Sequence, residues 1–222
     1  MEVSKLDERP ERLIDVVHKQ IHTEILGGNL VAGDQLSVPE LSRQLGVSRG
    51  SVREAVLQLV AEGLAEERPR RGVVVAKIGP DEVRQIHEIR EVLEGQAARL
   101  AAELRSAELC DQLDAALREQ SQAIDSADAG GYADTDSHFH AMLAAACGNP
   151  MLGTLIERLH TQMQVALDRV AEAAEHRCLG HDELNAVADA VRAGDGDAAE
   201  KAMRAHIRRT RQKVATAQED NK

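Results

Sequence analysis

Residues 36–64 constrain the fold more than any other part of this 222-residue chain. They are typical of two short helices joined by a tight turn at Gly46, with Ser48 opening the second helix. In that second helix apolar residues recur at helical spacing and predict a buried face: Val52, Val56, Leu59 and Val60. Arg49 and Arg53 are four residues apart, so they project together from a neighbouring face. A helix of this kind suits a DNA major groove.

A basic turn and a β-branched run follow this helix directly. Pro69 and Gly72 bound the turn, Arg70 and Arg71 lie within it, and residues 73–75 are all valine. A plain helical hairpin with solvated arginines does not account for this order of elements. The order therefore predicts a winged helix-turn-helix that binds double-stranded DNA.

The charge distribution along the chain agrees with a DNA-binding N-terminal part. The net charge is −11, but residues 1–77 carry 11 Lys and Arg against 12 Asp and Glu, whereas the remainder carries 16 against 26. Because salt screens charges beyond about 10 Å, attraction to phosphate is a local property. We expect the acidic remainder to face away from DNA.

Composition also limits the compartment and the class of protein. The three cysteines, Cys110, Cys147 and Cys178, are far apart and without a Cys-x-x-Cys motif, so we expect buried, reduced thiols. The charged start of the chain resembles no signal peptide, and no run is long and apolar enough to cross a bilayer. We therefore expect a cytoplasmic protein without a membrane partner.

The predicted fold class is mainly α with a small α+β part. An amphipathic helix at 11–26, ended by Gly27 and Gly28, precedes the winged unit, which we expect to span 1–77. From residue 78 to 222 we expect an all-helical antiparallel bundle, with helices at 81–104, 106–127, 131–146, 150–174, 177–193 and 196–217. Breaks are expected at Ser106, Asp128 to Gly131, Gly148 to Pro150, Leu179-Gly180 and Gly194 to Gly196.

The N-terminal segment resembles the GntR family of bacterial transcriptional regulators. The matching positions are Gly33, Leu36, Leu41, Gly46-Val47-Ser48-Arg49, Val52-Arg53-Glu54-Ala55, Glu62-Gly63-Leu64 and Pro69-Arg70-Arg71-Gly72. The helical remainder looks like the FadR-type ligand-sensing (FCD) domain of that family. This second resemblance is carried by residues 90–94, 136–140, 148–149 and 203–206.

The resemblance implies a set of DNA contacts, by Ser48, Arg49, Gly50, Ser51, Arg53, Arg70, Arg71 and Gly72. Arginine pairs well with guanine in the major groove and with phosphate anywhere, and the wing would enter the minor groove. Two positions depart from the family. Gly50-Ser51 stands where Thr-Pro is usual, which leaves base preference open, and Pro39 stands where a DNA-contacting side chain is common.

Three side chains of the second unit form a candidate site for a metal and an effector. Asp136 and His140 are four residues apart on one helix face, and His206 lies among apolar residues on the final helix. The resemblance implies a fourth ligand, a histidine 22 residues before His206, but Leu184 occupies that position and is expected to pack inward. Water, effector or His181 could complete a site for zinc, nickel or manganese.

Three interpretations of these residues stay open. Asp136, His140 and His206 hold a metal; or no metal binds and the cavity recognises its effector through Arg90, His140 and His206; or the side chains only satisfy one another. Arg90 is either a clamp for a carboxylate effector or the partner of Glu94, four residues on. The remaining histidines of this unit are expected to be solvated: His87, His138, His160 and His176.

The sequence thus predicts a homodimeric transcription factor, a repressor rather than an activator. It would bind a pseudo-palindromic operator and respond to a small organic acid in the helical bundle. One alternative is a regulator for which the metal itself is the signal, although the loss of the fourth histidine argues against it. Another is a metal-dependent enzyme with a DNA-binding appendage, but no water-activating base stands at a convincing spacing.

Overall fold

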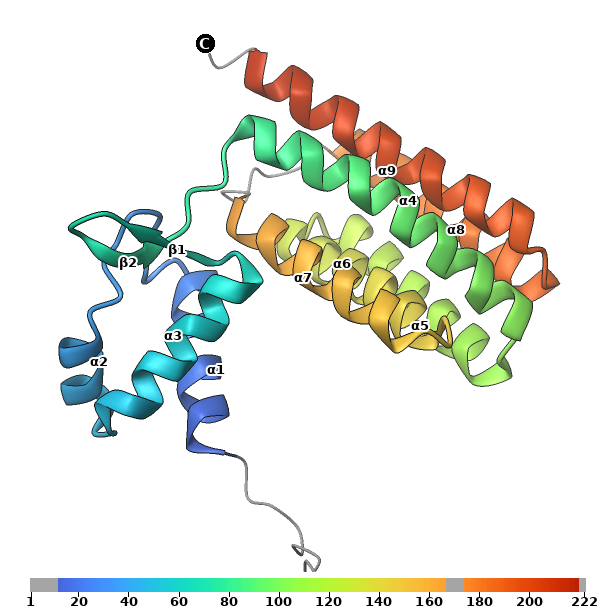
Figure 1. The fold of residues 1–222 in the computed structure, drawn as a ribbon. Coiled ribbons are helices and arrows are strands. Elements are labelled where there is room, and N and C mark those ends of the chain that lie inside the picture. Colours follow the sequence, from blue (N-terminus) through green and yellow to red (C-terminus); the bar gives the residue numbers. More distant parts are fainter. Residues whose placement is uncertain (1–11, 167–173, 220–222) are drawn as a thin grey trace, which may run out of the picture. The chain divides into compact units, whose positions relative to one another are not determined.

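The computed structural model describes residues 12–166 and 174–219 of the chain (Figure 1). The chain separates into two compact units between Ile78 and Gly79. Each unit has its own arrangement of helices and is described by itself.

The first unit is a three-helix domain with a two-stranded wing. Its elements are α1 (Leu13–Leu26), α2 (Val38–Leu45), α3 (Arg49–Glu62), β1 (Ala65–Arg68) and β2 (Gly72–Val75). The two strands are antiparallel, with Ala65 opposite Val75 and Arg68 opposite Gly72. This is the winged helix-turn-helix that the sequence predicts.

The turn between α2 and α3 forms as its residues predict. Gly46 ends α2 with φ of 66°, a left-handed conformation that suits glycine. Ser48 caps α3, because its hydroxyl accepts a hydrogen bond from the backbone nitrogen of Ser51 at 3.1 Å. Val52 and Leu59 of α3 are fully buried, whereas Arg49 and Arg53 are exposed. The predicted division of α3 into a core face and a free basic face is confirmed.

The second unit is a helical bundle. Its helices are α4 (Pro80–Leu104), α5 (Ala107–Asp125), α6 (Ala129–Ala146), α7 (Pro150–Ala166), α8 (Ala174–Ala193) and α9 (Gly196–Glu219). α4 and α9 lie side by side along most of their length (Figure 1). The fold class, mainly α with a small wing, is confirmed.

Aliphatic side chains fill the bundle, as the near absence of aromatic residues requires. One cluster joins α4, α5, α6, α8 and α9 around Leu113, Phe139 and Leu143. Leu184 belongs to this cluster and is fully buried, so the expectation that it packs inward is confirmed.

The break expected at Leu179-Gly180 is wrong, because α8 runs unbroken from Ala174 to Ala193. Gly180 is needed there for close packing: a Cβ atom at this position would lie 2.3 Å from the hydroxyl oxygen of Tyr132. α8 also begins earlier than the expected residue 177. The expected helix 150–174 ends as α7 at Ala166, and the part of that expectation over 167–173 lies outside the described residues.

The expectation of buried thiols is also only partly met. Cys147 is buried and Cys110 is half-buried, but Cys178 is exposed on α8. All three are free thiols. Within the described ranges, no helix has both the length and the apolar character that crossing a bilayer requires.

The packing of α3 gives a direct test of the first unit. Leu59→Ala removes a fully buried side chain, and we expect the free energy of unfolding to fall by about 2–5 kcal/mol. Leu57→Ala on the same helix is the matched control, since Leu57 is 48% exposed and should change stability by less than about 0.5 kcal/mol. Urea unfolding followed by circular dichroism measures both; equal effects would contradict the assignment of the buried face.

Candidate DNA-contact surface and sensor site

The candidate DNA contacts of α3 lie at its first two turns. Ser48, Arg49, Gly50 and Arg53 are exposed, and Ser51 is half-buried. The Ser48 hydroxyl caps the helix, and the Ser51 hydroxyl lies 3.0 Å from it, within hydrogen-bond distance. Arg49 and Arg53 are therefore the α3 candidates whose side chains are long and cationic enough to reach a duplex.

The wing presents a second basic group. Arg70, Arg71 and Gly72 are all exposed between β1 and β2, and Arg70 adopts a left-handed φ of 66°. Gln35 donates a hydrogen bond from its side-chain nitrogen to the carbonyl oxygen of Arg71 at 2.7 Å, which holds the wing against the connector that precedes α2. The backbone that carries the wing arginines is thus anchored to the rest of the domain through Gln35.

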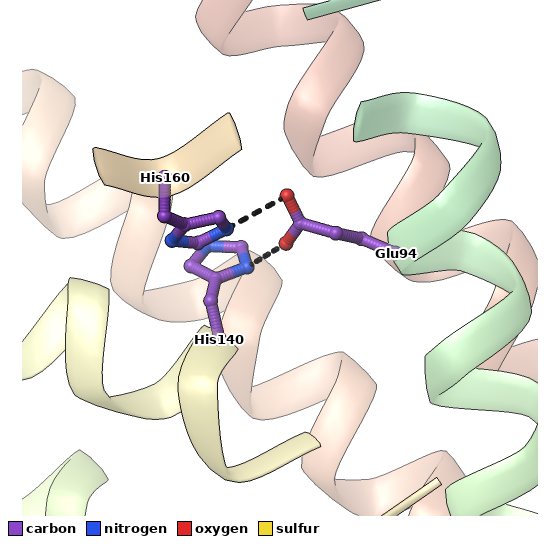
Figure 2. Close-up of side chains that lie close together, drawn as sticks. All are labelled: Glu94, His140 and His160. Atoms are coloured by element: carbon purple, nitrogen blue, oxygen red, sulfur yellow. Dashed lines mark hydrogen bonds and ion pairs between the residues drawn. The ribbon is translucent and has the colours of Figure 1, made fainter. Parts of the chain in front are cut away.

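The interior of the second unit contains a buried carboxylate at its centre. Glu94 on α4 accepts a hydrogen bond from Arg90 Nε at 2.6 Å and faces two imidazoles (Figure 2). His160 Nε2 on α7 lies 2.9 Å from one carboxylate oxygen, and His140 Nδ1 on α6 lies 2.5 Å from the other. Glu94 is 3% exposed, so this cluster links three helices away from water.

The charges of the cluster follow from this geometry. Burial alone raises the pKa of Glu94, but Arg90, His140 and His160 outweigh it and hold that pKa well below 4.5. Burial and then Arg90 lower the pKa of His160, so its ring is neutral and its Nε2–H donates a hydrogen bond to Glu94. Glu94 therefore accepts hydrogen bonds from Arg90 and His160 and makes a close ion-pair contact with His140.

His140 faces Glu94 through Nδ1 and faces His206 of α9 through its other ring nitrogen, Nε2. Their Nε2 atoms are 3.3 Å apart, and His140 Nε2 is 3.8 Å from Asp136 Oδ2. Both Nδ1 atoms are occupied: His140 Nδ1 by Glu94, and His206 Nδ1 by Glu183 at 2.9 Å. Because a carboxylate only accepts, each Nδ1 faces it with a proton, and in the neutral ring each Nε2 then has a lone pair.

Two lone pairs that face each other need a cation between them, either a proton or a metal ion. The ligand atoms of Asp136, His140 and His206 all lie within 4.8 Å of one another. Metal-binding histidines commonly donate their other nitrogen to a carboxylate, as these two do. The residues present therefore fit a divalent ion, with open positions for oxygen ligands.

The structure does not bring the other predicted ligands to this group. His181 Nδ1 instead lies 2.9 Å from the side-chain oxygen of Gln120. Leu184, a fully buried apolar side chain, stands in place of the histidine ligand that the family resemblance implies. Arg90 is held by Glu94, the second of the two roles considered for it.

The expectation that His87 and His160 are solvated is wrong. His160 is part of the Glu94 cluster, and His87 is 1% exposed with neither ring nitrogen hydrogen-bonded within the described ranges. Burial, and then the charge of Arg90, lowers the pKa of His87 to about 3. His138 and His176 are exposed, as expected.

Four further residues of this region were not predicted from the sequence: His160, Glu183, Arg209 and Tyr132. His160 had a usable signal, since Ile156 and Met163 place it on the buried face of α7. Glu183 accepts hydrogen bonds from Arg209 Nε as well as from His206, and these partners lower its pKa although burial raises it. No local pattern distinguishes Glu183 from the other surface carboxylates of α8.

Comparisons with known proteins agree with this architecture. Residues 13–75 match the bacterial regulatory proteins of the gntR family, and residues 85–209 match the FCD domain. The chain therefore belongs to the GntR family of transcriptional regulators, in the branch that carries an FCD domain, and is a DNA-binding regulator.

Individual relatives extend over nearly the whole chain. The HTH-type transcriptional repressor RspR of Escherichia coli K12 is 30% identical over 210 residues, covering 92% of this chain and 90% of RspR. The repressor NanR of Enterobacter sp. is 28% identical over 218 residues, covering 89% and 83%. These relatives are regulators and not enzymes.

Solved structures show the same fold. E. coli McbR/YncC superposes with a TM-score of 0.77 at 22% identity, covering 94% of this chain and 99% of that one. A GntR regulator from Rhodococcus sp. RHA1 gives a TM-score of 0.73, also at 22% identity, and covers 92% and 98%.

The burial of His87 predicts a specific loss of stability in acid. Its folded pKa of about 3 lies below the ordinary 6.5, so between these values the unfolded chain binds a proton that the folded bundle excludes. Relative to its value above pH 6.5, the free energy of unfolding therefore declines as the pH falls, by up to about 1.4 kcal/mol per pH unit. In His87→Gln, which cannot titrate, urea unfolding between pH 6.5 and 4.5 should show a shallower decline.

His138→Gln is the matched control, because His138 is exposed on α6. It should keep the wild-type dependence on pH. A His87→Gln variant that loses stability as steeply as the wild type would show that His87 does not stay neutral in the folded state.

Proposed function

We propose that this regulator is a repressor that binds a pseudo-palindromic operator as a homodimer and is released by a small organic acid. The observation that carries the DNA-binding part is the two-sided character of α3. On its apolar face Val52 and Leu59 are fully buried, whereas Arg49 and Arg53 are exposed near its N-terminal end. Two such helices related by a two-fold axis suit successive half-sites.

The individual contacts follow from side-chain chemistry. Arg49 and Arg53 would contact base edges or phosphates in the major groove. Ser48, Gly50 and Ser51 would lie close to the sugar-phosphate backbone of the DNA. Arg70 and Arg71 would enter the minor groove, and Gly72 would allow the wing to approach closely. Pro39 supplies no hydrogen-bonding side chain from α2, so this chain would depend on α3 and the wing.

Control by an effector requires a difference in affinity. An effector releases the operator only if it binds the DNA-free arrangement of the dimer more tightly than the DNA-bound one. The names of the relatives RspR and NanR as repressors support repression here.

We further propose that Asp136, His140 and His206 hold a divalent metal such as zinc, nickel or manganese. The inward lone pairs of the two imidazoles and the nearby carboxylate support this assignment. The ion would act as a Lewis acid with free positions for an oxygen of the effector. A role for the metal itself as the signal is less well supported, because Leu184 leaves the ligand set incomplete.

The operator proposal is tested by Arg49→Ala. The side chain is exposed, so the melting temperature should stay near the wild-type value, whereas affinity for an operator selected from random duplexes should fall by about 10-fold or more. The salt dependence of binding should become shallower if Arg49 contacts phosphate. Fluorescence anisotropy with labelled duplex measures both quantities.

Lys19→Ala is the control for simple loss of positive charge, since Lys19 is exposed on α1 of the same unit. It should bind the operator much as the wild type does. Equal losses in the two variants, or none in Arg49→Ala, would remove α3 from the proposed interface.

The metal proposal is tested by Asp136→Ala. This side chain is 29% exposed, so the helix should tolerate its loss, whereas metal affinity should fall by at least about 10-fold. Titration of chelator-treated protein with zinc, nickel or manganese gives the affinities. Asp134→Ala, an exposed neighbour on α6, should bind metal normally. Wild-type affinity in the Asp136 variant would assign the metal elsewhere.

A further inference from the structure

Several buried hydrogen-bond donors in the second unit have no acceptor. Arg177 Nε on α8, Arg209 Nη1 on α9 and Gln120 Nε2 on α5 are each buried without a partner among the residues that the structure describes. Arg177 is 6% exposed and Gln120 is 1% exposed. A buried donor left without an acceptor costs about 1–3 kcal/mol, and more when it is charged, so these groups call for an explanation.

The orphaned donors surround one face of α8. Arg177 and His181 are one helical turn apart and therefore neighbours on that face. His181 Nδ1 lies 2.9 Å from the side-chain oxygen of Gln120, which brings the free amide nitrogen of Gln120 to the same region. Gly180 lies between Arg177 and His181 in the sequence. A Cβ atom on Gly180 would be 3.2 Å from Arg209 Nη2.

Tyr132 adds a hydroxyl to this group. A Cβ atom on Gly180 would lie 2.3 Å from the Tyr132 oxygen, so the phenol and the Arg209 guanidinium both approach α8 where it has no side chain. Burial, and then Asp136, raises the pKa of Tyr132, so its hydroxyl keeps its proton and can donate a hydrogen bond. Arg177 is also close enough to act on that pKa.

Among the described carboxylates near these donors, Glu183 pairs with one of them, Arg209. Glu183 has both oxygens engaged, by Arg209 Nε and by His206 Nδ1. Asp136 is partly exposed and faces His140. Arg90, the guanidinium considered above as a clamp for a carboxylate effector, is already paired with Glu94. Arg177 is therefore the guanidinium of this group for which the described residues supply no carboxylate partner.

We propose that Arg177, Arg209, Tyr132 and Gln120 form a subsite for an oxyanion, which takes the carboxylate of a small organic acid. A guanidinium offers a planar fork that matches a carboxylate, and an amide and a phenol complete its hydrogen bonds. Tyr132 and Asp136 are one turn apart on α6, so a dicarboxylate could also extend toward the imidazole pair. This inference rests on the proposed effector control and assigns the anion to α8 instead of Arg90.

Calorimetric titration of full-length, chelator-treated protein tests the subsite without any metal. The probes are acetate, succinate and inorganic phosphate. Succinate should bind the wild type, and Arg177→Gln should weaken it by about 10- to 100-fold, the equivalent of one lost charged hydrogen bond. Tyr132→Phe, which removes only the hydroxyl, should weaken it by a smaller factor. Arg118→Gln, an exposed site on α5, is the control and should keep wild-type affinity.

A melting curve without ligand separates this role from a structural one. Because Arg177 Nε has no acceptor, Arg177→Gln should melt at or above the wild-type temperature. A clear drop would instead indicate a structural ion pair and would overturn the proposal. So would equal succinate affinity in Arg177→Gln and the wild type, or no response to any of the three anions. Binding of phosphate alone would overturn the assignment to carboxylates.

Operator binding by the same preparations keeps the two proposals apart. If succinate binds through Arg177 but the wild type does not bind selected duplexes, the repressor proposal fails and the subsite stands. If duplexes bind normally and Arg177→Gln has no effect on succinate, the subsite fails and DNA binding stands.

Discussion

The contact between the Glu94 carboxylate and its three partners decides how the interior of the helical unit is organised. Arg90 neutralises the carboxylate from its own helix, and His140 and His160 approach it from α6 and α7. A buried charge is tolerable only when it is paired and hydrogen-bonded, so these side chains have little freedom to rearrange. The same contact fixes the proton of His140 on Nδ1 and turns its lone pair toward His206.

The bundle therefore separates two kinds of polar group. In the Glu94 cluster the charges are matched, because the carboxylate pairs with Arg90 and faces the two imidazoles. Around α8 the donors exceed the acceptors, since Arg177, Arg209 and Gln120 each retain a buried donor. Asp136, His140 and His206 lie between these regions. An organic anion that binds here would meet a pre-formed set of donors and would not have to break the Glu94 cluster.

The sequence predicted the first unit almost completely, because periodicity and capping are local properties. The apolar stripe of α3, the Ser48 cap and the valine-rich strand can each be read within a few residues. The Asp136, His140 and His206 group was also predicted, although partly through family resemblance. The Glu94 cluster and the donors around α8 were not, because they depend on which helix faces which. Gly180 shows the difficulty: it resembles a helix break, yet it permits a close approach by Tyr132.

Carboxylates hold the Nδ1 protons of His140 and His206, which leaves both Nε2 lone pairs inside the bundle. Nitrogen-15 NMR of the imidazole rings in metal-loaded protein tests it most directly, since protonated and unprotonated ring nitrogens resonate far apart. We expect a protonated Nδ1 and a proton-free Nε2 on both rings. A proton on Nε2 of either ring would contradict it.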